Sequence, residues 1–163
     1  GLSGLLTAFL LQEQGFQVTV LEAGSIASGQ TQNTTAKITS QHNLIYDTLL
    51  RDFGKDTAKQ YAEANQTAIA AYQRIIDRLQ IDCDFEIKKA YLYAVHDEHP
   101  LLREAMAADS LGLPAHFTRQ TELPFPAAFA HHLHHLLHLT ELLHHPVDLA
   151  DVHTCASGDP VLS

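Results

Sequence analysis

The sequence predicts an α/β fold, and the order of its helix and strand patterns indicates this. A helix pattern over residues 2–14 is followed by a short β-branched strand over residues 18–21. A much longer helix pattern covers residues 56–80, and two short strand patterns follow near residues 83–88 and 90–95. Helices that alternate with short strands are typical of domains that pack helices against a sheet.

The first helix and strand have clear ends. The apolar face of the helix consists of Leu5, Leu6, Phe9 and Leu10. Gly15 is expected to end this helix, because glycine readily adopts the left-handed conformation of a helix C-terminus. The run Val18 to Leu21 has the composition of a buried parallel strand. Residues 23–35, which are rich in Gly, Ser and Thr, are expected to form a loop.

The middle of the chain predicts two helices, over residues 43–53 and 56–80, that are separated at Gly54. Asn65 interrupts the apolar stripe of the longer helix. A buried amide must be hydrogen-bonded, so we interpret Asn65 as an interior residue with a partner. The stripe consists of Ala58, Tyr61, Asn65, Ala68, Ile69, Tyr72, Ile75, Ile76 and Leu79.

Further strands and a helix are expected downstream of the long helix. Lys88 and Lys89 are expected to form the turn between the two short strands. Residues 99–111 are expected to form a helix that Gly112 and Pro114 end. Tyr91 and Tyr93 alternate on the second strand, and core packing is the favoured interpretation of both.

Composition excludes several classes of partner. The chain has 163 residues and a net charge of −9 at pH 7, so it has no basic footprint for nucleic acid or for an anionic membrane. No stretch approaches the roughly 18 apolar residues of a membrane-spanning helix. The two cysteines, Cys83 and Cys155, are far apart in sequence and indicate no disulfide framework. We therefore expect a cytoplasmic protein with no nucleic-acid and no membrane partner.

Residues 127–163 differ in composition from the rest of the chain. No Lys or Arg follows Arg119, and eight of the twelve histidines lie between His131 and His153. Three hypotheses remain open: a shifted reading frame, a structured helix, and a metal site. On a helix, one side would carry His131, His134 or His135, His138 and His145. No established ligand spacing is met, so no metal ligand is predicted.

The opening residues carry part of a dinucleotide-binding fingerprint. Gly1 and Gly4 correspond to the last two glycines of G-x-G-x-x-G, and the first glycine and the strand before it are absent. Glu22 lies 21 residues after Gly1, close to the spacing of about 20 residues expected for a carboxylate that binds ribose hydroxyls. Free N–H groups at the start of the helix would bind a diphosphate. The spacing predicts a Rossmann-type unit, and the alternative is an ordinary α/β unit with these glycines.

Residues 1–126 also resemble a known family. The stretches "GLSGLLTAFLLQEQGFQVTVLEAGSIASGQTQNTTAKITSQH" and "YAEANQTAI" resemble FAD-dependent oxidoreductases of the D-amino-acid oxidase and glycine oxidase type. They are similar to bacterial members that often carry a C-terminal Rieske iron–sulfur domain. The resemblance implies an internal fragment that begins just after the first strand. It also implies three regions: a partial FAD-binding domain with a helical insertion (1–82), the start of an α+β substrate domain (83–126), and a His-rich tail of doubtful nativeness (127–163).

The resemblance implies FAD as cofactor and assigns residues to its parts. The diphosphate is expected to contact Gly1, Ser3 and Gly4, and the adenosine ribose Glu22 and Ala23. The stretch that would pass over the diphosphate and adenosine is Ser28, Gly29, Gln30 and Thr31. The stretch that would approach the ribityl chain and flavin is Thr35, Ala36, Lys37 and Ile38. Lys37 would stabilise negative charge on the reduced ring, and the alternative is a solvated loop lysine.

The function that follows is a flavin-dependent oxidation. The parent protein is expected to transfer a hydride from an amine-type or similar small substrate to the flavin, and electrons would then leave to oxygen or another carrier. No catalytic base is predicted, because the segments that cover the flavin in the family lie beyond residue 126. Two alternatives remain: an inactive truncated fragment that cannot hold FAD, and a His-rich metal-binding protein.

Overall fold

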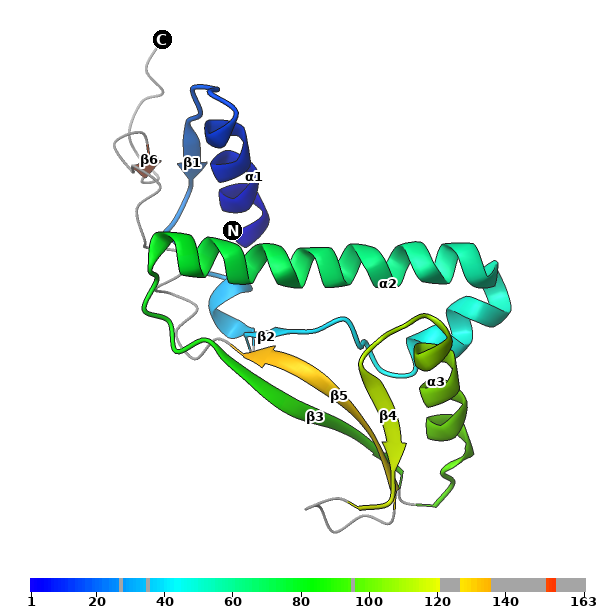
Figure 1. Cartoon of the computed structure of the whole chain (residues 1–163). Helices are drawn as coiled ribbons and strands as arrows, with labels where there is room; N and C mark the ends of the chain where they lie inside the picture. Colours follow the sequence, from blue (N-terminus) through cyan, green and yellow to red (C-terminus); the bar gives the residue numbers. More distant parts are fainter. Residues whose placement is uncertain (27, 35, 95, 121–126, 136–151, 155–163) are drawn as a thin grey trace.

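The computed structural model describes residues 1–26, 28–34, 36–94, 96–120, 127–135 and 152–154. Two helices of twelve residues and one long bent helix accompany two separate sheets (Figure 1). The elements in chain order are α1 (Leu2–Glu13), β1 (Val20–Glu22), the 3-10 helix η1 (Thr31–Asn33), β2 (Lys37–Ile38), α2 (Ile45–Leu79), β3 (Glu86–Ala94), α3 (His99–Ser110), β4 (Ala115–Thr118), β5 (Ala127–His135) and β6 (Val152–Thr154).

The first helix and strand form where the sequence predicts them, but their burial differs: Leu10 of the predicted apolar helix face is 58% exposed. Gly15 has a φ of 83°, in the left-handed region, directly after the end of α1. β1 pairs in parallel with β6, so the predicted parallel strand is confirmed. Its predicted burial is wrong, because Val20 is only half-buried and Leu21 is 74% exposed. The described part of this sheet holds two strands, which leaves one edge of β1 without a paired strand among the described residues.

The second sheet has the order β2-β5-β3, and β4 also pairs with β5; all these pairs are antiparallel. The two predicted strands near residues 83–88 and 90–95 are one strand, β3. Lys88 and Lys89 do not form a turn, because they continue the ladder opposite Leu133 and His132. Nine consecutive residues of β3 face nine of β5, and this pairing outweighs the local preference of two lysines for a turn.

The histidine-rich segment begins as a strand. Residues 127–135 form β5, so the helical interpretation of His131, His134 and His135 is wrong. The physical reason is that β5 satisfies the backbone groups of three other strands, while Phe129 is fully buried in the core. His138 and His145 lie outside the described residues. The predicted division at residues 82 and 126 stays a prediction, although strands from all three regions meet in this sheet.

The long helix contains the predicted interruption at Gly54. Its φ of 80° and ψ of 170° are not helical, and α2 bends sharply near its start (Figure 1). Only glycine adopts this conformation without strain, so Gly54 separates the two predicted helices. The main core gathers residues of α2, α3 and β5 around Tyr46, Ala62, Leu101, Ala105, Ala107, Ala108, Leu113 and Phe129. Helix α3, predicted over residues 99–111, ends at Ser110.

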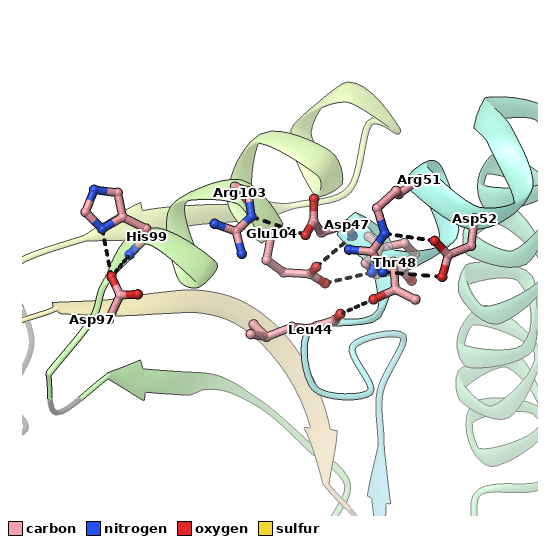
Figure 2. Close-up of polar contacts among 10 residues, drawn as sticks. Leu44, Asp47, Thr48, Arg51, Asp52, Asp97, His99, Arg103 and Glu104 are labelled. Atoms are coloured by element: carbon pink, nitrogen blue, oxygen red, sulfur yellow. Dashed lines mark hydrogen bonds and ion pairs between the residues drawn. The ribbon is translucent and has the colours of Figure 1, made fainter.

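A carboxylate from α3 caps the start of α2. Glu104 is fully buried, and its two oxygens accept hydrogen bonds from the backbone N–H groups of Tyr46 (3.0 Å) and Asp47 (2.9 Å) (Figure 2). The side-chain amide of Gln41 also donates to Glu104. Helix α2 has no side-chain cap of its own, so Glu104 satisfies N–H groups that would otherwise be buried without a partner. The Gln41 contact attaches residues 39–43 to α3, and the Tyr46 hydroxyl of α2 donates to the Ser40 carbonyl.

Candidate cofactor-binding site

The start of α1 presents free backbone donors. Gly1 is the residue before the first helical residue and offers no side-chain cap, and the Leu5 N–H donates to the Gly1 carbonyl at 3.2 Å. The N–H groups of Leu2, Ser3 and Gly4 therefore have no acceptor inside the helix. They also lie at the positive end of the helix dipole. This end of α1 suits a bound anion, as the sequence predicts.

Glu22 lies at the C-terminal end of β1 and next to the start of α1. Its Oε2 is 3.8 Å from the Gly1 nitrogen, and its Oε1 accepts a hydrogen bond from the Gly24 N–H at 3.0 Å. The side chain is about 30% exposed, so its oxygens remain accessible to a ligand. The predicted proximity of Glu22 to the helix start is confirmed, while its contact with a ribose stays a prediction. Ala23 follows it and is exposed.

The loop after β1 returns to the start of α1. A Cβ placed on Gly1 would lie 3.5 Å from Oγ1 of Thr31, so Thr31 is beside Gly1. The other predicted loop residues contact their own loop: Ser28 N–H donates to Ser25 O, and Gly29 and Gln30 carbonyls accept from Asn33. The structure therefore brings together Gly1, Glu22 and Thr31. It does not bring the loop residues 28–30 to the helix through any such contact.

Gly4 has open space around it. No described residue lies within 4 Å of a Cβ placed on Gly4. The close packing against a strand that the fingerprint implies is thus not seen among the described residues. The position remains suited to an approaching ligand, because Ser3 and Gly4 are both exposed.

A cavity of about 320 Å³ adjoins the start of α1. Leu2 of the first helical turn forms part of its wall, and so do Ala36, Lys37 and Ile38 of the predicted flavin stretch. Thr35, the remaining member of that stretch, lies outside the described residues. The opposite wall comes from α2. Three of the predicted residues therefore do meet at one cavity beside the anion-binding helix start.

Polar side chains that the sequence did not single out also line this cavity. They are Thr34, Thr39, His42 and Tyr72. Burial raises the pKa of Tyr72 above its ordinary value, so its phenol is neutral near pH 7. The sequence carried one signal for Tyr72. The spacing of Tyr61, Asn65 and Tyr72 places polar atoms at intervals along one stripe of an otherwise apolar helix face.

Asn65 is half-buried, and its amide donates to the Tyr61 carbonyl at 2.8 Å. Its interpretation as a satisfied residue is confirmed. It also borders the cavity, which was not expected.

The cavity is rich in donors and poor in negative charge. Lys37 is exposed and, within the described part of the chain, forms no ion pair. No carboxylate is among the described residues of the wall, while Ile38, Ala68 and Ile69 supply apolar surface. Ligand pockets generally hold about 300–1,000 Å³. The volume of this cavity, about 320 Å³, lies at the lower end of that range, and Leu2 at the start of α1 forms part of its wall.

The parallel pair of β1 and β6, the helix start with Gly1 and Gly4 and the adjoining carboxylate of Glu22 are features found in dinucleotide-binding units of the Rossmann type. The chain belongs to the family described as FAD dependent oxidoreductase (DAO), whose model matches residues 1–151. FAD is accordingly the cofactor of this family. The resemblance read from the sequence ended at residue 126. The family match extends past that residue and includes β5.

Two curated relatives support this assignment. The chain is 37% identical over 132 residues to YhfW of Bacillus subtilis (strain 168), which is named as a Rieske 2Fe-2S iron-sulfur protein, and 32% identical over 85 residues to gamma-glutamylputrescine oxidoreductase of Escherichia coli (strain K12). The matches cover 80% and 52% of this chain but only 26% and 20% of those proteins. No solved structure is significantly similar to the chain.

The described residues also bear on the metal and membrane expectations. In the part of the chain that the structure describes, no three His, Cys, Asp or Glu side chains gather as a metal site. This gives the metal-binding alternative no support. None of the helices in the described ranges is long and apolar enough to cross a membrane.

Proposed function

We propose that this chain supplies part of the FAD site of an enzyme that oxidises an amine-type or similar small substrate. The observation that carries the proposal is the arrangement of Glu22, the free N–H groups of α1 and the adjoining cavity. A carboxylate suits ribose hydroxyls, a helix start suits a diphosphate, and a partly apolar cavity suits a ring system. The three features follow one another in the order of the parts of FAD.

The chain's own residues would bind and orient the cofactor. Glu22 would accept hydrogen bonds from the adenosine ribose, and the N–H groups of Ser3 and Gly4 would donate to the diphosphate. Lys37 would lie near the flavin and favour negative charge on it. FAD, when bound, supplies the acceptor for the hydride that the substrate loses. Ser28, Gly29, Gln30 and Thr31 would pass over the diphosphate and the adenosine.

The substrate class and a partner domain rest on the relatives. One relative is named a gamma-glutamylputrescine oxidoreductase, which supports an amine-type substrate. The other is named as a Rieske iron-sulfur protein, which supports a Rieske domain in the longer protein to which this chain corresponds. A cytoplasmic location remains our proposal for the same protein.

The test is a titration of the purified chain with FAD, followed by calorimetry and by the flavin absorbance. Glu22→Ala should weaken FAD binding about tenfold to hundredfold, because hydrogen bonds to a charged group contribute about 1.5–3 kcal/mol each. Glu63→Ala is the matched control, since Glu63 is exposed on α2 and pairs only with Lys59 among the described residues. Failure of the wild-type chain to bind FAD, or equal binding by Glu22→Ala, would contradict the proposal.

A further inference from the structure

His42 lies in the segment between β2 and α2 (residues 39–44) and borders the cavity of about 320 Å³. Its Nδ1 is 2.9 Å from the hydroxyl oxygen of Tyr61, and the two rings meet edge to face with centroids 6.3 Å apart. The imidazole is exposed, so it is accessible to a molecule in the cavity. Its Nε2 has no hydrogen-bond partner among the described residues. A ring that is held at one nitrogen and open at the other is suited to binding a ligand.

The position of His42 is fixed from two directions. Tyr61 packs edge to face against the fully buried Tyr46, with ring centroids 6.0 Å apart. The residue before His42 is Gln41, which is buried and donates to the capping carboxylate of Glu104. The Gln41 N–H also donates to Thr39 at 3.0 Å. Both the backbone and the ring of His42 are therefore attached to the core, which limits the entropy lost when a ligand binds.

We propose that His42, oriented by Tyr61, is a binding residue for the ring end of the cofactor, an inference that rests on the proposed FAD site. When Tyr61 donates to Nδ1, Nε2 carries the proton and can donate to a carbonyl oxygen or to a ring nitrogen that carries no hydrogen. Carbonyl oxygens and unprotonated ring nitrogens lie along the polar edge of a flavin ring. The diphosphate of ADP has neither group. Lys37 in the same cavity is a second donor.

The proposed role of His42 and Tyr61 predicts different effects on the binding of FAD and of ADP. His42→Ala should weaken FAD binding about fivefold to tenfold and leave the binding of ADP unchanged within about twofold. Tyr61→Phe, which keeps the ring on Tyr46 and removes only the hydroxyl, should weaken FAD binding in the same direction. If the residues act as one unit, the double variant should lose no more affinity than the weaker-binding single variant.

Calorimetric titrations of the full 163-residue chain with FAD and with ADP test this. His116→Ala is the matched control, because His116 is exposed on β4 and is not part of the cavity wall. His42→Gln should recover part of the loss, because its amide can donate from a place near Nε2. Thermal unfolding of each variant checks that the fold is retained.

Each outcome has a distinct meaning. If FAD and ADP bind, Glu22→Ala weakens both and His42→Ala weakens neither, the inference about His42 is wrong and the FAD site stands. If His42→Ala weakens both ligands equally, His42 does not act at the ring end. If the wild-type chain binds ADP as tightly as FAD, the cavity does not hold the ring. If it binds neither ligand, the proposed function fails, and the inference fails with it.

Discussion

Replacement of Glu104 should destabilise the chain more than any other single carboxylate among the described residues. The side chain is fully buried, and its oxygens accept from the N–H groups of Tyr46 and Asp47 and from the amide of Gln41 (Figure 2). In Glu104→Ala the two backbone N–H groups lose their acceptor, and the Gln41 amide keeps only the Asn43 carbonyl. Each buried donor without a partner costs about 1–3 kcal/mol. Because some of them would rehydrate, we expect a total loss of about 3–5 kcal/mol.

Glu104→Gln separates charge from shape. The amide oxygen can still accept from one of the two backbone N–H groups, but the amide NH₂ then faces the other. The negative charge at the positive end of α2 is also lost. We expect a loss of about 2–4 kcal/mol, which for a chain of this size corresponds to a fall of roughly 5–15 °C in Tm.

The assay is urea unfolding monitored by far-ultraviolet circular dichroism, supported by a thermal scan. Glu13→Gln is the control, because Glu13 pairs with Arg78 at 2.6 Å on the exposed surface. Exposed pairs contribute about 0–1 kcal/mol, so this variant should differ little from wild type. Should Glu104→Gln also unfold within 0.5 kcal/mol of wild type, Glu104 would not be the cap of α2, and the attachment of residues 39–43 would need another explanation.

Two further predictions concern Gly54 and Tyr46. Gly54→Ala should cost about 1–3 kcal/mol in urea unfolding, because a Cβ has open space there but alanine cannot adopt a φ of 80° and a ψ of 170° without strain; an unchanged midpoint would refute this. Burial raises the pKa of Tyr46 to about 12 from its ordinary 10, so its contribution is fully present below pH 10 and is lost as the pH rises towards 12. Tyr46→Phe should therefore show a smaller loss of stability between pH 9 and 11 than wild type, and an equal loss would contradict the assignment.

Local patterns predicted the opening of the chain well. The stop at Gly15 and the spacing from Gly1 to Glu22 depend on contacts within about twenty residues, and the structure keeps both. The predicted apolar face of residues 2–14 is kept only in part, because Phe9 is buried but Leu10 is 58% exposed. The interruption at Gly54 was also predicted from local sequence, because its backbone conformation is one that only glycine adopts without strain.

Long-range pairing explains what the sequence did not reveal. Lys88 and Lys89 read locally as a turn, yet β5 extends the strand through them. The histidines of β5 read locally as one side of a helix, and only the partner strands assign them to a sheet. His42 joined the candidate site because α2, whose Tyr61 lies nineteen positions away, forms the opposite wall of the cavity. No sequence pattern around His42 or within α2 predicts that these two residues are in contact.

The histidine-rich end carries a separate prediction. Translation of the coding DNA in the other two frames tests whether residues 127–163 arise from a shifted frame. Under that hypothesis, one of those frames continues with a strand-rich segment. The pairing of residues 127–135 with three strands, and a family match that reaches residue 151, are observations that the hypothesis must accommodate.

The most direct test of the site is an amide NMR titration of the ¹⁵N-labelled chain with ADP. If the start of α1 and Glu22 bind the adenosine diphosphate end of the cofactor, the largest shifts will be those of Ser3, Gly4 and Gly24. The amides of Thr7, Glu13 and Arg78, which border a separate groove between α1 and α2, will stay in place. Shifts that gather in this groove instead, or saturating ADP without any shift at Ser3 and Gly4, would contradict the account.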